Sequence, residues 1–238
     1  MITQNTKDMK YFLLALCLLQ STAATAQSSC SSDKTAAVKT IYERFTNADC
    51  EACWTQPLLT DKFGVTLDWL APSAAGDDAP LSAAANRDAL SRLENLKIQL
   101  PAKQQIVKTA VTNSAYKLRV AHGLAVAGYV GASIELTQFP RQLPAAKNLT
   151  AVLLLTETIA KGTADSPVER NLVRNMLIET WLIPAKSAGK TEKPVILTRR
   201  PLSISAGVNP DNLRVFGWVQ DSEGRVLTAA QSVCVDVK

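Results

Sequence analysis

The pattern of hydrophobic and polar positions in the first half of the chain alternates between strand and helix. Segments 38–45 and 65–70 have the length and the β-branched and aromatic content of strands. Residues 54–63 resemble a short helix, and Asn86 precedes a segment with apolar residues at helical spacing, namely Ala89, Leu90, Leu93 and Leu96. This order of strand, helix, strand and helix predicts an α/β fold.

The second half of the chain is richer in short strand-like segments, which are separated by glycine and proline. Four of them are 116–120, 124–130, 133–136 and 149–156. Segment 149–156 is apolar enough for a strand that is buried on both faces. Segments 213–220 and 225–233 flank a short polar turn and predict a β-hairpin.

One segment of the second half has two interpretations. A capping-box spacing before residue 168 favours a helix over 168–182, whereas residues 176–183 also suit a strand. With either outcome the second half is mostly β-structure. We therefore expect an α/β domain over residues 27–130 and a β-rich C-terminal subdomain over residues 131–238.

The N-terminus has the pattern of a secretory signal peptide. The mostly apolar segment 11–20 follows Lys7 and Lys10, and small residues follow at 24–26. The segment is too short to cross a membrane, which takes roughly 20 apolar residues. We expect residues 1–26 to be removed and the protein to be periplasmic or secreted, without a membrane span.

Composition excludes several classes of function. The formal net charge of +5 is mild, and no clustered basic stripe indicates binding of nucleic acid. His122 is the only histidine, so a zinc site with four Cys or His ligands is not expected. Cu(I) on Cys50 and Cys53 is chemically feasible but requires reduced thiols. We predict neither a cofactor nor a resident metal.

The cysteines suggest two disulfides. Cys17 lies in the predicted signal peptide, and the remaining four cysteines allow three pairings. The short spacing favours Cys50 with Cys53. Cys30 and Cys234 lie near the two ends of the mature chain, and domain termini are often close in space. We predict a structural disulfide between them, with a free Cys30 as the alternative.

The Cys50-Glu51-Ala52-Cys53 sequence carries the clearest chemistry in the chain. A strand that ends in a Cys-x-x-Cys pair is how thioredoxin-like domains present a redox dithiol. A helix that begins there favours the thiolate of Cys50, and Cys53 would be the resolving thiol. The carboxylates of Asp49 and Glu51 oppose this effect.

Segment 45–53, Phe-Thr-Asn-Ala-Asp-Cys-Glu-Ala-Cys, resembles the Phe-Thr-Ser-Gln-Gly-Cys-Ser-Ser-Cys-Pro-Pro signature of a family of exported bacterial thioredoxin-like proteins of unknown function, the DUF1223 and Omp28-like group. Segments 65–69, 86–90 and 169–174 resemble later parts of that family, in the same order. Trp54 replaces the first proline of the signature, and the histidines of the family's middle segment are absent. The resemblance implies a thioredoxin-like core with a β-rich C-terminal extension.

Two functions follow from these observations. The first is a thiol–disulfide oxidoreductase with Cys50 and Cys53 as catalytic residues and protein thiols or disulfides as partners. The second is a non-enzymatic periplasmic binding or structural protein, in which both cysteine pairs are structural disulfides.

Overall fold

A computed structural model describes residues 30–33, 35–57, 61–112, 115–140, 147–183 and 196–234. The predicted signal peptide, residues 1–26, lies outside the described residues. Two β-sheets make up most of the described part, and its α-helices are α2 (Glu51–Trp54) and α3 (Arg87–Asn95). In this part of the chain, no helix has the length and the apolar composition needed to cross a membrane.

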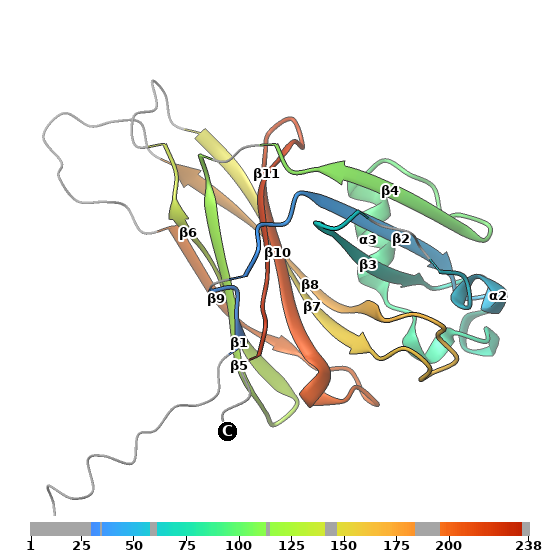
Figure 1. Cartoon of the computed structure of the whole chain (residues 1–238). Helices are drawn as coiled ribbons and strands as arrows, with labels where there is room; N and C mark the ends of the chain where they lie inside the picture. Colours follow the sequence, from blue (N-terminus) through green and yellow to red (C-terminus); the bar gives the residue numbers. More distant parts are fainter. Residues whose placement is uncertain are drawn as a thin grey trace, which may run out of the picture.

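The larger sheet has seven strands in the order β11-β10-β7-β8-β3-β2-β4 (Figure 1). In that order the strands are β11 (Val226–Gln231), β10 (Leu213–Asp221), β7 (Lys147–Ile159), β8 (Arg170–Ile183), β3 (Gly64–Ala71), β2 (Thr40–Asn47) and β4 (Gln104–Ala110). Strand β2 is parallel to β3 and antiparallel to β4. The carboxyl ends of β2 and β3 therefore lie at the same edge of the sheet.

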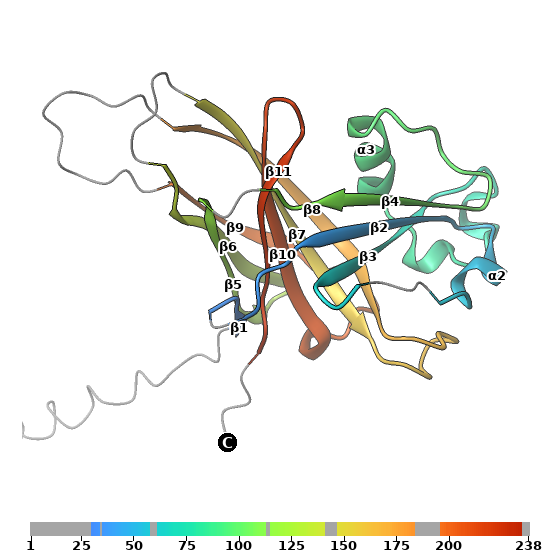
Figure 2. The same cartoon turned by 45° about the horizontal axis from the view of Figure 1, so that its top comes forward.

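The smaller sheet has four strands in the order β1-β5-β6-β9. These strands are β1 (Cys30–Ser31), β5 (Lys117–Val126), β6 (Tyr129–Gln138) and β9 (Ile196–Ser203). The sheet packs against the β7, β10 and β11 side of the larger sheet, away from β2 and β3 (Figures 1 and 2). The two sheets form a sandwich over only part of the larger sheet.

Strand β7 contributes to a hydrophobic core on each of its faces. Leu153 and Leu155 belong to the core between the two sheets. Val152 and Leu154 point the other way, into a second core that includes Ala89 and other residues of α3. Successive side chains of a strand point to opposite faces, so a strand covered on both sides is apolar throughout. The prediction of a doubly buried strand at 149–156 is confirmed.

A buried ion pair fixes helix α3 to the larger sheet. Arg92 of α3 donates two hydrogen bonds to Glu43 of β2, at 2.8 and 2.7 Å, and both side chains are buried. The guanidinium of Arg92 also lies 4.9 Å from the ring centroid of Trp218 on β10. The predicted start of this helix is confirmed, because the side chain of Asn86 accepts a hydrogen bond from the backbone N–H of Asp88.

The predicted α/β fold with a thioredoxin-like core is wrong. Strands make up 53% of the structure and helices 12%, and the strands form two large sheets. The helix expected over 54–63 overlaps α2 only at Trp54, and residues 55–57 and 61–63 are not helical. Pro57 disfavours helical backbone in the residue before it. Residues 58–60 lie outside the described residues. The segment 168–182, for which helix and strand were both open, is occupied by β8.

The larger sheet runs through both halves of the chain. Its β2, β3 and β4 come from the segment before residue 130, and β7, β8, β10 and β11 come from the segment after it. Residue 130 itself lies within β6. The C-terminal hairpin is confirmed as β10 and β11, with Asp221 accepting hydrogen bonds from the backbone N–H groups of Glu223 and Arg225 in the turn.

The two parts of the larger sheet meet where β3 runs parallel to β8. The two strands are in register at Asp68 and Leu172. Side chains add to the contact near this point: Asn171 of β8 donates to the Thr66 carbonyl of β3 at 3.0 Å, and Asp88 of α3 accepts from the N–H of Met176 in β8 at 2.8 Å. We call this contact the β3–β8 junction. Polar side chains here supplement a short backbone ladder.

Gly217 of β10 lies against side chains of the smaller sheet. A Cβ atom at this position would lie 2.8 Å from Val120 Cγ1 and 2.9 Å from Ile134 Cδ1. We predict that Gly217→Ala lowers the free energy of unfolding by about 1–3 kcal/mol, because the added methyl overpacks the core. Gly131→Ala is the matched control, since its Cβ would meet nothing within 4 Å. Equal stability of the two variants in urea denaturation would contradict this packing.

Candidate functional site

The Cys50–Cys53 disulfide closes the turn between β2 and α2. Asn47, the last residue of β2, organises this turn. Its side-chain oxygen accepts a hydrogen bond from the Asp49 N–H at 3.0 Å, and its carbonyl accepts from the Cys50 N–H at 2.9 Å. Its amide group donates to the Pro101 carbonyl at 3.1 Å, which ties the turn to the segment that leads into β4.

The two cysteines of this pair differ in exposure. Cys50 is half-buried, whereas Cys53 is only 4% exposed. The carbonyl of Cys53 accepts hydrogen bonds from the Gln56 N–H at 3.2 Å and from the Gln104 side chain at 3.4 Å. An external reagent therefore meets Cys50 before Cys53.

The surroundings of Cys50 give less support to a thiolate than the sequence suggested. Helix α2 has four residues, which is one turn, so it supplies little of the dipole of a full helix. Asp49 and Glu51 are exposed on either side of Cys50. The carboxylate of Asp49 accepts a hydrogen bond from the Ser73 hydroxyl at 2.7 Å, which holds it at the turn.

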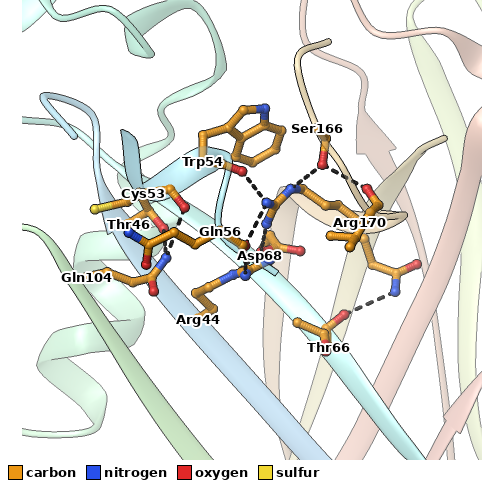
Figure 3. A network of polar contacts seen from close by, with 12 residues as sticks. Arg44, Thr46, Cys53, Trp54, Gln56, Thr66, Asp68, Gln104, Ser166 and Arg170 are labelled. Atoms are coloured by element: carbon orange, nitrogen blue, oxygen red, sulfur yellow. Dashed lines mark hydrogen bonds and ion pairs between the residues drawn. The ribbon is translucent and has the colours of Figure 1, made fainter. Parts of the chain in front are cut away.

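A buried cluster of charges lies beside Trp54 and Gln56, which follow Cys53 in the chain (Figure 3). Asp68 of β3 accepts hydrogen bonds on the same oxygen from Arg44 Nε at 2.6 Å and from Arg170 Nη1 at 3.1 Å. All three side chains are at most 3% exposed. Ser166 accepts from Arg170 Nε at 2.6 Å. We call Arg44, Asp68 and Arg170 the arginine–aspartate cluster.

The two arginines of the cluster also bind the backbone that follows the disulfide. Arg44 Nη1 donates to the Gln56 carbonyl at 3.0 Å, and Arg170 Nη2 donates to the carbonyls of Trp54 and Gln56. The last carbonyls of a helix have no partner within the helix. Here guanidinium groups from β2 and β8 supply that partner, so the end of α2 is fixed to the larger sheet.

Trp54 is held by the same cluster. Its ring centroid lies 4.3 Å from the guanidinium carbon of Arg170, and its indole N–H donates to the Ala164 carbonyl at 2.7 Å. Stacking of a guanidinium on an indole is favourable, more so when both are removed from water. Trp54 is 7% exposed and packs in a small core with Leu70 and Leu172.

Asp68 is the least satisfied member of the cluster. Burial raises the pKa of Asp68 to about 6, against the opposing effect of Arg44. Its second oxygen, Oδ2, is buried without a hydrogen-bond partner among the described residues. The cluster therefore holds two guanidinium groups against one carboxylate in a place with little access to water.

The second disulfide joins Cys30 and Cys234, which are 204 residues apart in the sequence. It connects β1 to the segment that follows β11. Strand β1 and helix α2 lie at different ends of the molecule in both views (Figures 1 and 2). The structure thus brings the predicted site residues together as two separate pairs.

The arginine–aspartate cluster was missed in the sequence. Its signal was charge within apolar strand segments: Arg44 lies in 38–45 and Asp68 lies in 65–70. Buried charges are rare unless they are paired. The pairing itself was not visible, because Asp68 is 24 residues from Arg44 and 102 residues from Arg170 in the sequence.

No family model matches the chain, and no curated protein matches it. Among solved structures, the chain is similar to HBP35 of Porphyromonas gingivalis. The match has a TM-score of 0.48 and 10% sequence identity, and it covers 84% of this chain and 76% of that chain. The resemblance to the DUF1223 and Omp28-like group stays a prediction.

The role of Arg170 in stability is testable. We predict that Arg170→Met lowers the free energy of unfolding by about 3–5 kcal/mol, because it breaks a buried ion pair and removes the guanidinium donor of the Trp54 carbonyl. Arg200→Met is the control, since the Arg200–Glu179 pair is exposed and spans 3.3 Å. A difference of less than about 1 kcal/mol between the two variants in urea denaturation would contradict the role of the cluster.

The pKa of Asp68 gives a second, pH-dependent prediction. The pKa of Asp68 is raised from 3.8 to about 6 in the folded protein. Between these two pH values, the folded state keeps a proton on Asp68 that the unfolded state has already lost. The stability that Asp68 contributes is therefore greatest below pH 3.8 and is lost as the pH rises through about 6. We predict that the stability of the wild type relative to Asp68→Asn decreases over this range in urea denaturation. An increase would show that the two arginines, and not burial, set this pKa.

Proposed function

We propose that this protein is an exported thiol–disulfide exchange protein, with Cys50 as the attacking thiol and Cys53 as the resolving thiol. The observation that carries the proposal is the difference in exposure within one disulfide: Cys50 is half-buried and Cys53 is 4% exposed. Exchange requires an accessible sulfur and a second thiol close enough to resolve the mixed disulfide, and shielding of the second sulfur directs the first attack to the accessible one. Protein thiols or disulfides are the proposed substrates.

The reaction balances without a cofactor. In the reduced protein the Cys50 thiolate attacks one sulfur of a substrate disulfide, which forms a mixed disulfide and releases the other substrate sulfur as a thiolate. The Cys53 thiol then loses its proton and attacks Cys50 Sγ. The second substrate thiolate leaves, and the Cys50–Cys53 bond forms. The substrate gains two electrons and two protons, and the protein loses them. The reverse sequence oxidises a substrate dithiol.

The arginine–aspartate cluster supports this chemistry by holding the resolving cysteine in place. It binds the carbonyls of Trp54 and Gln56, and Gln104 binds the carbonyl of Cys53. A resolving thiol that is fixed beside the mixed disulfide reacts as an intramolecular group, which raises its effective concentration. The residues of the cluster are positioning residues and take no part in the electron transfer.

A structural role for the disulfide is the second candidate function. It is favoured by the exposed carboxylates of Asp49 and Glu51 beside Cys50 and by the single turn of α2, since both features weaken stabilisation of a thiolate. In that case the chain is a non-enzymatic binding or structural protein of the periplasm or the extracellular space. Two disulfides are typical of such oxidising compartments with either function.

Single-cysteine variants separate the two thiols. We predict that reduced Cys53→Ser forms a mixed disulfide with glutathione disulfide at least about tenfold faster than reduced Cys50→Ser, because reactivity requires access as well as a thiolate. The measurement is the rate of glutathione addition by mass spectrometry, with peptide mapping to show that Cys30–Cys234 remains oxidised. Equal rates, or a faster Cys53, would contradict the assignment of Cys50 as the attacking thiol.

A further inference from the structure

A second constellation of reactive side chains surrounds the Cys30–Cys234 disulfide, away from α2. The two sulfurs and a ring nitrogen of His122 all lie within 4.8 Å of one another. The fold dictates this arrangement: His122 of β5 is the register partner of Cys30 in β1, and a backbone bridge between Ser31 and Val233 places Cys234 beside them. The three residues come from three distant parts of the sequence.

The two ring nitrogens of His122 differ in their hydrogen bonding. Its Nδ1 lies 2.9 Å from the Gly123 carbonyl. Because a carbonyl only accepts, this contact assigns the ring proton to Nδ1. The Nε2 lone pair is then free. Nε2 is buried without a hydrogen-bond partner among the described residues, and His122 is 6% exposed. A backbone carbonyl on one ring nitrogen commonly orients the other nitrogen toward a metal.

We propose that reduction of the Cys30–Cys234 disulfide creates a Cu(I) site whose ligands are the two cysteine sulfurs and Nε2 of His122. A dithiol is the reductant: its two sulfurs form a disulfide, the Cys30–Cys234 bond breaks, and two protons pass from the dithiol to the cysteines. Binding of Cu(I) then releases these two protons to water. The oxidised protein has no thiolate at this place and does not bind the ion.

The ligand set favours Cu(I) over Zn²⁺. Within the described residues this group contains two cysteines and one histidine and no fourth Cys, His, Asp or Glu. Structural zinc sites are almost always four-coordinate, whereas soft thiolate ligands suit Cu(I). Two thiolates and Cu(I) carry a net charge of −1. An open cavity of about 530 Å³ adjoins the site and is lined by His122, Arg119, Arg199 and Arg200. Arg119 pairs with Asp33 and Arg200 pairs with Glu179, and Arg199 adds a further positive charge to the lining.

The test uses the full chain with Cys17, Cys50 and Cys53 changed to serine, so that Cys30 and Cys234 are the only cysteines left. The protein is reduced with dithiothreitol, freed of reductant and titrated with Cu(I) against a chromophoric Cu(I) chelator under anaerobic conditions. We expect one bound Cu(I) per chain after reduction and none before it. Adding His122→Asn should weaken binding at least about tenfold, by analogy with the loss that follows when the partners of metal ligands are removed.

Circular dichroism of each variant, with and without Cu(I), shows whether a loss of Cu(I) binding is caused by unfolding. X-ray absorption at the copper edge of the loaded protein should show two sulfur ligands and one nitrogen ligand. The proposal is overturned if the reduced protein binds no Cu(I), or if folded His122→Asn binds it as tightly as its parent. It is also overturned if the ligand shell holds sulfur alone, if one equivalent of Zn²⁺ displaces the Cu(I), or if the reduced protein stays unfolded when Cu(I) is added.

Discussion

The pairing of Asp68 with Arg44 and Arg170 is the interaction on which the rest of the structure depends. It lies at the β3–β8 junction, where the parallel strands are in register at Asp68 and Leu172. Two buried guanidinium groups join β2, β3 and β8 there and also bind the carbonyls at the end of α2. Removing one partner of a buried pair is costly because the remaining charge stays out of water. The cluster thus holds the two parts of the larger sheet in one arrangement.

This constraint has a direct consequence for the disulfide turn. Single-turn α2 has too few internal hydrogen bonds to be stable alone, so its geometry comes from its surroundings. Asn47 fixes the start of the turn and the two arginines fix its end. Between these anchors, Cys53 is buried and Cys50 remains accessible. The same rigidity suits a resolving thiol and a structural bridge, so only the chemistry of the pair separates the two functions.

The sequence predicted the features that local patterns control, such as the cap at Asn86 and the doubly buried strand at 149–156. It failed where distant residues decide the structure. The helix expected over 54–63 overlaps the observed single turn α2 only at Trp54. Pro57 disfavours a helical continuation, and two arginines from other strands bind the carbonyls of Trp54 and Gln56. Segment 168–182 was ambiguous because it is a strand between β7 and β3, and this environment is set by tertiary structure. The Cys50–Cys53 pair followed from its spacing and the Cys30–Cys234 pair from its position near the two chain ends. The neighbouring Arg170 and His122 could not be assigned from the sequence, because distant segments bring them there.

The reduction potential of the Cys50–Cys53 disulfide is the most direct test of the proposed exchange function. The full chain is equilibrated in glutathione buffers of graded potential, and the redox state of each cysteine pair is read separately by alkylation and peptide mass spectrometry. The proposed function predicts a potential between about −120 and −270 mV, the range of exchange proteins. A potential below about −300 mV is that of a structural disulfide, and it would contradict an exchange function for Cys50 and Cys53.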